Sequence, residues 1–367
     1  MSCMEESLDR SPGGSRDAND AGLSRLAVEE RAGGSDVKAN QDFKAVLERM
    51  LSGDKLALAR MITFVENDAS FVSEILERIY PRTGRCYSIG VTGPPGAGKS
   101  SLVDKLIPRM RSEGKTVGVV AVDPSSPFTG GAVLGDRIRM QRHALDDGVF
   151  IRSLGTRGTH GGLSRATRDV LRLLDAFGMD VVIIETVGVG QTELDIVDVA
   201  DTTLVMLVPE SGDTIQTMKA GLMEIAEIFV VNKADRPGAD RILTELKSMV
   251  QLGERRDAGW KIPVLLCQAN RDEGTDAVYE TLAQHRAYLA SKGPSKEERR
   301  EHRRKELLDI LTHRFLKNVE ELEQQDERFC ALLAMAGEEK ANPYQIVRDI
   351  FQDEGLVRRI LERGGGR

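Results

Sequence analysis

The stretch Gly93–Ser100 reads GPPGAGKS, the pattern of a phosphate-binding P-loop. It lies between the apolar run Ser88–Val91 and the segment Leu102–Ile107, whose apolar residues have helical spacing. Glycines let backbone N–H groups wrap phosphate oxygens, and the N-terminus of the following helix adds partial positive charge. Lys99 can then reach the β and γ phosphates, and the Ser100 hydroxyl can bind Mg²⁺. The stretch therefore predicts a nucleoside triphosphate site.

Composition limits the possible partners. The chain has 367 residues, enough for one large α/β domain with helical additions, and its 51 Lys+Arg against 58 Asp+Glu give a net charge of −7. This balance provides no general basic field for nucleic acid or an anionic membrane. The four cysteines lie far apart, and no apolar run approaches the roughly 20 residues that span a bilayer. We expect a cytoplasmic protein without nucleic-acid or membrane partners.

Four regions follow from the pattern of apolar residues. Residues 1–41 are rich in Gly, Ser, Asp and Arg and are predicted to be a disordered tail. Residues 42–82 carry three helical patterns and form a helical extension. Residues 83–290 form the nucleotide domain, and residues 291–367 form a C-terminal helical arm.

The nucleotide domain alternates apolar runs with helical patterns, which predicts an α/β fold. The predicted strands are 88–91, 116–122, 149–154, 181–184, 203–208, 228–231 and 264–267. Their runs are continuous rather than alternating, as expected for a mostly parallel sheet covered by helices on both faces. In such sheets the ligand binds beyond the carboxyl ends of the strands.

Two carboxylates at predicted strand ends, Asp123 and Glu185, are candidates for the magnesium site, and Asp136 follows at the end of the loop after Asp123. Asp123 closes one strand and could hold Mg²⁺ or its water, although a turn or capping role fits as well. Asp136 precedes a helical pattern and has a capping alternative. Glu185 ends the strand Val181–Ile184 in the manner of a Walker B carboxylate, with Gly188 placed for its N–H to sense the γ phosphate.

The sequence Asn232–Asp235, NKAD, follows a predicted strand and indicates recognition of guanine. A carboxylate at Asp235 accepts from the N1–H and N2–H₂ groups of guanine, which adenine lacks. Asn232 would brace the loop, and Lys233 would cover the base. Gln268–Asn270, after the last strand, would supply a backbone N–H to the guanine oxygen. These positions favour GTP over ATP.

The C-terminal arm contains an apolar seam with spacings of three and four, formed by Leu308, Leu311, Phe315, Val319 and Leu322. This seam suits a helix that docks on its own body or on a second copy. It predicts dimerisation through the arm.

Several phrases together resemble one family, the methylmalonyl-CoA mutase-associated GTPases of the MeaB, ArgK or mitochondrial MMAA type. The phrases are GPPGAGKSSL, VAVDPSSPFTGGAVLGDRIRM, RGTHGGL, VVIIETVGVGQTE and VVNKAD. The resemblance implies a SIMIBI-class G domain with an N-terminal helical extension and a C-terminal dimerisation arm. It also implies a Mg²⁺-dependent GTPase that acts as a chaperone for an adenosylcobalamin-dependent acyl-CoA mutase, gating cofactor loading and protecting the mutase.

The resemblance also assigns residue roles. Lys99, Asp136 and Glu185 are the expected catalytic residues, and Ser100, Asp123 and Glu185 the expected magnesium ligands. Asp136 corresponds to the carboxylate that orders the attacking water, and Glu210–Lys219 to a switch that senses the mutase. The expected nucleotide contacts are Gly96, Ala97, Gly98, Lys99, Ser100, Ser101, Gly188, Asn232, Lys233, Asp235, Gln268 and Ala269.

Three other functions stay open at this point. A nickel-inserting maturation GTPase shares the P-loop and the sheet, although such proteins carry His-rich or Cys/His sites and this chain has five scattered histidines. A kinase-like regulator of basic amino acid transport is the second. A nucleotide-switched binding module with negligible hydrolysis is the third.

Overall fold

A computed structural model describes residues 43–124, 140–143, 145–156, 165–186, 194–209, 221–252, 259–293, 296–335 and 342–362. The predicted disordered tail lies outside them. The chain divides into two compact units, the first up to Val250 with Val264–Thr275, and the second Gln251–Pro263 with the chain from Asp276 onward.

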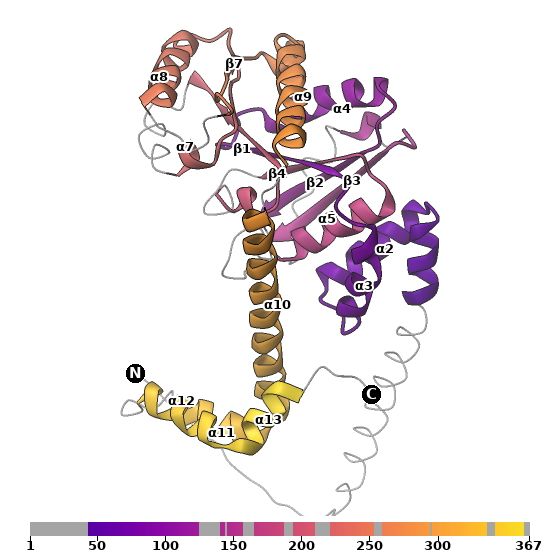
Figure 1. Cartoon of the computed structure of the whole chain (residues 1–367), viewed down its shortest axis with the longest axis vertical. Helices are drawn as coiled ribbons and strands as arrows, with labels where there is room; N and C mark the ends of the chain where they lie inside the picture. The colour runs from indigo at the N-terminus through magenta and orange to yellow at the C-terminus, as the bar shows by residue number, and fades with distance from the viewer. Residues whose placement is uncertain are drawn as a thin grey trace, which may run out of the picture. The chain divides into compact units, whose positions relative to one another are not determined.

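The first unit is built on a parallel seven-stranded sheet (Figure 1). Its strands are β1 (Tyr87–Thr92), β2 (Val117–Pro124), β3 (Val149–Thr156), β4 (Val181–Thr186), β5 (Thr202–Leu207), β6 (Ile228–Val231) and β7 (Val264–Leu266). The order is β3-β2-β4-β1-β5-β6-β7, and every pair is parallel. The predicted fold class is thus confirmed, and the carboxyl ends of all strands meet at one edge, with β1 between β4 and β5.

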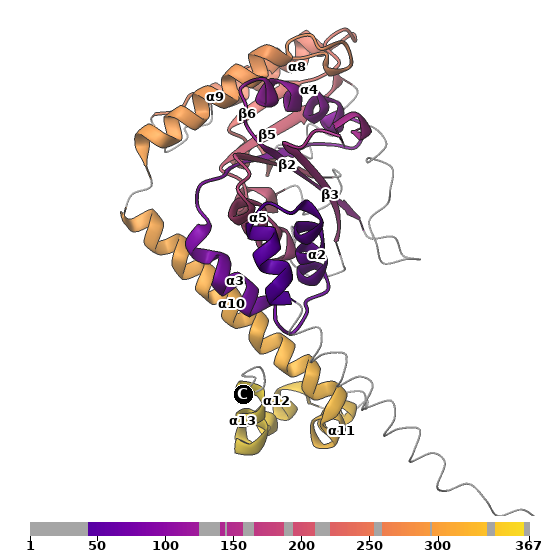
Figure 2. The same cartoon turned by 90° about the vertical axis from the view of Figure 1, so that its right-hand side faces the viewer.

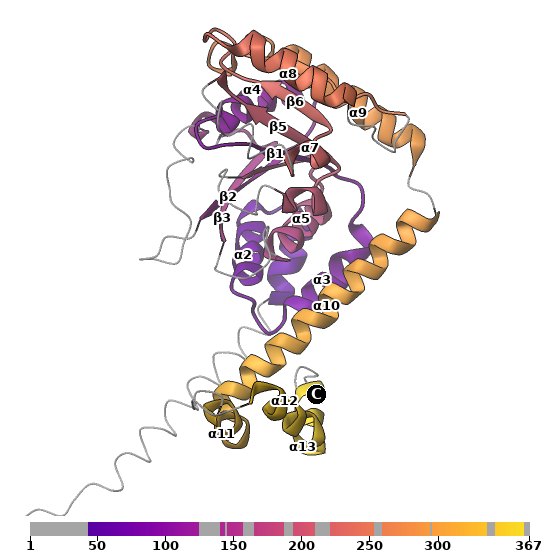
Figure 3. The ribbon, with the colours of Figure 1, turned by 90° about the vertical axis from the view of Figure 1, so that its left-hand side faces the viewer.

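Helices cover both faces of this sheet. They are α2 (Lys55–Glu66), α3 (Val72–Ile79), α4 (Lys99–Ser112), α5 (Arg165–Phe177), α7 (Leu222–Ile225) and α8 (Ala239–Leu252), with 3-10 turns η1 (Tyr80–Arg82), η2 (Gln141–His143), η4 (Asp195–Asp198) and η6 (Ala269–Arg271). Figures 2 and 3 show α4 on one face of the sheet and α5 with α2 and α3 on the other. Burial on both faces explains why β1, β4, β5 and β6 lack polar alternation.

The N-terminal helices share one hydrophobic core with a face of the sheet. A helix over 43–51 contributes Phe43, whose ring stacks on Phe71 at 4.8 Å between centroids. The same core takes in Val120 of β2 and Leu173 of α5. A partly buried ion pair between Glu66 of α2 and Arg152 of β3 adds a polar link. The helical extension therefore packs as part of the first unit.

The second unit is helical. It consists mainly of α9 (Thr275–Lys292), α10 (Lys296–Gln325), α11 (Glu327–Met335), α12 (Pro343–Gln352) and α13 (Glu354–Glu362). The last turns of α10 pack with α11–α13 around a small core of Leu322, Phe329, Ile346, Ile350, Leu356 and Ile360. Asn318 Nδ2 donates to the Ile360 carbonyl at 2.6 Å and ties α10 to α13.

The predicted seam on α10 divides into two parts. Leu322 is fully buried in the arm's own core, and Val319 packs against it. Leu308, Leu311 and Phe315 are exposed, with 47%, 55% and 37% of their surfaces accessible.

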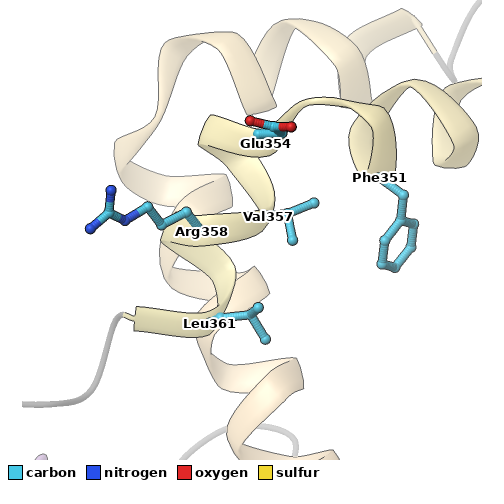
Figure 4. Close-up of a pocket in the computed structure, with 5 residues that line it drawn as sticks. All are labelled: Phe351, Glu354, Val357, Arg358 and Leu361. Atoms are coloured by element: carbon cyan, nitrogen blue, oxygen red, sulfur yellow. The ribbon is translucent and has the colours of Figure 1, made fainter.

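A groove of about 300 Å³ on the same arm is lined by Phe351, Glu354, Val357, Arg358 and Leu361. In Figure 4 its apolar side chains lie to one side and Arg358 extends to the other. None of the described helices is long and apolar enough to cross a bilayer.

Candidate nucleotide site

The P-loop joins β1 to α4 at the carboxyl edge of the sheet. Gly93, Gly96 and Gly98 have φ angles of +135°, +73° and +90°, which L side chains rarely adopt. At Gly93 a Cβ would also lie only 2.1 Å from the Met206 carbonyl oxygen. The glycines of the motif are therefore required by the path of the backbone, and the loop delivers the chain to the first turn of α4.

Lys99 opens α4, and its side chain is buried within the loop. Its Nζ donates to the carbonyls of Gly93 at 2.7 Å and Pro94 at 3.0 Å. Lys99 therefore links the first turn of α4 to the start of the P-loop. Because an ammonium group has three donors, it can exchange these carbonyl partners for phosphate oxygens with little movement of the helix.

Ser100 and Glu185 meet although 85 residues separate them in the sequence. The Ser100 hydroxyl donates to Glu185 Oε1 at 2.5 Å, and both side chains are buried. β4 lies next to β1 in the sheet, which brings the carboxylate at its end beside the P-loop. A hydroxyl and a carboxylate are hard oxygen ligands of the type that Mg²⁺ prefers. The donor set fits that ion.

The other predicted magnesium and switch residues are only partly described. Asp123 lies near the end of β2, opposite Gly155 of β3 at the same edge of the sheet, and its side chain is not described. Asp136, Gly188 and the segment 210–219 lie outside the described residues.

Asn232 connects the phosphate and base regions. It follows β6, and its side-chain Nδ2 donates to the Ala97 carbonyl of the P-loop at 2.7 Å. Its Oδ1 accepts from the Ala269 N–H at 3.0 Å. A Cβ on Gly98 would lie 2.3 Å from the same Nδ2. The bracing role predicted for Asn232 thus corresponds to two defined hydrogen bonds.

The two hydrogen bonds of Asn232 to Ala97 and Ala269 are called the Asn232 bracket below. The remaining base-site residues lie close to it in the sequence. Lys233 has a left-handed backbone with φ +57°, and Asp235 is exposed two residues later. Gln268 is buried, and its backbone N–H and C=O pair with Glu273 at 2.8 Å and 3.3 Å. Ala269 is buried and gives its N–H to Asn232 in this conformation. The structure thus brings Asn232 and Ala269 into direct contact, with Lys233, Asp235 and Gln268 adjacent in sequence.

Two polar links on α4 were not found by the sequence reasoning. Asp104 accepts from Arg142 Nε at 2.7 Å and lies 3.0 Å from His143 Nε2, which holds η2 against the helix. Arg109 forms an ion pair with Asp272 beyond η6. No local motif marks these residues. Only their charges, at positions a turn or more beyond the P-loop, could have drawn attention to them.

Comparison with known proteins places the chain in a family. The sequence model described as "Methylmalonyl Co-A mutase-associated GTPase MeaB" matches residues 58–324. The chain belongs to the MeaB family. It is accordingly a GTPase, with a P-loop fold shared by the family's relatives.

Relatives of this chain occur in archaea, bacteria and animals. A protein of Pyrococcus abyssi named as a GTPase is 48% identical over 310 residues, which cover 84% of this chain and 95% of the relative. The GTPase ArgK of Escherichia coli is 34% identical, with 73% and 85% covered. The mouse "Methylmalonic aciduria type A homolog, mitochondrial" is 33% identical, with 66% and 63% covered. A solved structure titled as an LAO/AO transport system kinase has 26% identity and a TM-score of 0.62, with 84% and 96% covered.

Proposed function

We propose that the chain hydrolyses GTP with Mg²⁺ and acts as a chaperone for an adenosylcobalamin-dependent acyl-CoA mutase. The observation that carries the GTP site is the bracket of Asn232, which ties the P-loop to the turn after β7 by hydrogen bonds of 2.7 Å and 3.0 Å. The family's description and the name of the mouse relative support the mutase as partner.

In this proposal the residues near the P-loop stabilise charge on the phosphoryl oxygens. Lys99 Nζ and the loop amides donate to the phosphates, while water attacks in line. Ser100, Glu185 and Asp123 would hold Mg²⁺, which when bound neutralises charge on the β and γ phosphate oxygens. Asp136 would orient the water, and the Gly188 amide would sense the γ phosphate. GDP and phosphate are the products.

The proposed base site uses the elements after β6 and β7. Asp235 would accept from the guanine N1–H and N2–H₂ groups, and Lys233 would cover the ring. A backbone amide of the turn Gln268–Asn270 would donate to the guanine oxygen. Ser101 and Gly96–Gly98 would complete the phosphate cradle.

We further propose that residues 291–367 form a dimerisation arm on a G domain of residues 83–290. The exposed apolar face of α10, including Leu308, Leu311 and Phe315, would be covered by a second copy. We also propose a cytoplasmic location without nucleic-acid or membrane partners.

The deciding experiment measures GTP hydrolysis by the purified chain, with ATP as control, alone and with the acyl-CoA mutase of the same organism. We expect hydrolysis of GTP only, faster when the mutase is present. Glu185→Gln should abolish the Mg²⁺-dependent rate, whereas Glu77→Gln, on the exposed side of α3, should leave it unchanged.

Two outcomes would contradict the proposal. An unchanged rate and the absence of a complex with the mutase would exclude the chaperone role while leaving the GTPase intact. Transfer of the γ phosphate to a transport protein would instead favour the kinase-like alternative.

A further inference from the structure

An ion pair fastens the turn after β7 to the helix that begins at the P-loop. Arg109 lies in the third turn of α4, and its Nη1 is 3.0 Å from Asp272 Oδ1. The same Nη1 donates to the Lys105 carbonyl at 2.8 Å, which holds the guanidinium along the helix. The Arg109 side chain is mostly buried, with 18% of its surface exposed. The Asp272 side chain is 43% exposed, so the pair is shielded from solvent on its arginine side only.

Asp272 is itself held in a fixed conformation. It ends η6 with a left-handed backbone, φ +64°, which aspartate tolerates better than most residues. The Thr275 hydroxyl donates to Asp272 Oδ1 at 2.5 Å, and Thr275 is fully buried. Burial raises the pKa of Asp272, but the hydrogen bonds from Thr275 and Arg109 outweigh it, and the pKa lies below its usual value. The carboxylate is charged at neutral pH.

The turn that this ion pair holds is the one predicted to meet the base. It contains Gln268, which pairs through its backbone with Glu273, and Ala269, whose N–H donates to Asn232. The turn is thus tied to the strand-end loop on one side and to α4 on the other. A helix rises about 1.5 Å per residue, so Arg109 lies about 15 Å along α4 from Lys99. The same helix, α4, therefore carries both Lys99 of the P-loop and Arg109, which anchors the base turn.

We propose that Arg109 and Asp272 are positioning residues for purine recognition, because their ion pair holds the turn Gln268–Glu273 at a fixed distance from the P-loop. This inference rests on the proposed function, in which that turn contacts the guanine oxygen. Loss of the pair frees the turn and weakens the contact that guanine makes and adenine does not. The phosphate contacts of the P-loop are left in place. The selective effect is therefore on the base.

The test compares dissociation constants for GDP and ADP in the full-length chain. Arg109→Ala and Asp272→Asn should each weaken GDP binding about three- to tenfold and leave ADP binding unchanged. Asp272→Asn retains a residue that tolerates the left-handed backbone, so it keeps the test open if the arginine variant folds poorly. Arg109→Lys should restore part of the loss. The double variant should be no weaker than either single one, because both remove the same interaction.

A matched control lies two residues along the same helix. Arg111 forms an ion pair with Asp146 at 2.9 Å, of similar exposure, away from the base turn. Arg111→Ala should lower the melting temperature without changing the ratio of GDP to ADP affinity. The kinetic counterpart is a raised KM for GTP with an unchanged kcat in the Arg109 and Asp272 variants, since the reacting groups are untouched.

Three results would overturn the inference. An unchanged GDP to ADP ratio in folded Arg109→Ala and Asp272→Asn proteins would show that the pair does not position the turn. Equal weakening of GDP and ADP would assign the pair to the P-loop instead. A wild-type chain that binds GDP and ADP equally would refute the proposed base site itself, and the inference with it.

Discussion

At the scale of single residues, the glycines of the P-loop act through the space around them as well as through their backbone freedom. Gly98 and Gly114 both have positive φ angles, +90° and +76°. A Cβ on Gly98 would meet the Asn232 amide nitrogen at 2.3 Å, whereas a Cβ on Gly114 would meet nothing within 4 Å. Substituting each glycine by alanine therefore distinguishes backbone strain, present at both positions, from a steric clash with Asn232, present only at Gly98.

Gly98→Ala should displace the Asn232 side chain and weaken GDP binding at least about tenfold. Gly114→Ala carries only the left-handed strain, about 1–2 kcal/mol, and should lower the melting temperature with GDP affinity unchanged. Isothermal titration with GDP and thermal unfolding of both variants provide the measurement. Equal GDP affinities in the two variants would mean that the Asn232 bracket does not support nucleotide binding.

The burial of His285 should make the stability of the second unit depend on pH. Burial lowers the pKa of His285 to about 4, and its ring lies 4.6 Å from that of Trp260, the only tryptophan of the chain. The unfolded chain binds a proton at this position below its ordinary pKa near 6.5, but the folded chain does so only near pH 4. The free energy of unfolding therefore falls as the pH drops through this window and is fully recovered above it.

We expect His285 to lower the free energy of unfolding by up to about 3 kcal/mol as the pH falls from 6.5 to 4. Urea unfolding followed by Trp260 fluorescence measures it across the window. His285→Gln should flatten the dependence relative to wild type, since glutamine does not titrate. The same pH dependence in both proteins would exclude His285 as its source.

At the scale of elements, the N-terminal helices are part of the sheet's core rather than an appendage. Phe43 is fully buried and stacks on Phe71, while Leu56 on α2 is 78% exposed. The ion pair of Arg152 with Glu66 connects α2 to the edge strand β3. These helices thus complete the face of the sheet that α5 leaves uncovered.

Phe43→Ala should lower the free energy of unfolding by about 3–5 kcal/mol, because it removes a fully buried ring and leaves a cavity. Leu56→Ala should change it by less than about 0.5 kcal/mol. Urea unfolding monitored by circular dichroism compares the two. A small effect of Phe43→Ala would show that the helical extension unfolds independently of the sheet.

At the scale of the whole molecule, the arm has more apolar surface than its own core buries. Leu322 is enclosed by α11–α13, while Leu311 and Phe315 lie exposed on the same helix. Unpaired apolar faces of this kind are typical of protein interfaces. The exposed half of α10 is therefore where the proposed contact between two copies would lie.

Leu311→Glu combined with Phe315→Glu should convert a dimer into a monomer, because it places charges in the proposed interface. Sedimentation velocity measures the mass, with Leu56→Glu on the first unit as control. An unchanged dimer in the arm variant would move the interface elsewhere, and a monomeric wild type would refute the proposed dimer.

The sequence by itself determined the fold class and the positions of the phosphate and base motifs. The P-loop pattern and the continuous apolar runs are local, because glycine conformations and strand burial follow from residues close together in the chain. All seven predicted strands occur, and Glu185 is the penultimate residue of β4, which runs one residue beyond the predicted carboxylate end. The phosphate and base motifs could therefore be recognised without coordinates. The roles of Asp136 and Gly188, and the domain boundaries, stay predictions.

Only the tertiary structure decided which distant residues meet. Ser100 reaches Glu185 because β4 is placed beside β1, and Asn232 bridges Ala97 and Ala269 because three strand ends share one edge. The pairing of Arg109 with Asp272 has no sequence signal, since it depends on where α4 passes the turn after β7. Such contacts form only when the sheet order is complete. Spacing along the chain cannot specify them, because the order of parallel strands is set by packing among elements far apart in sequence.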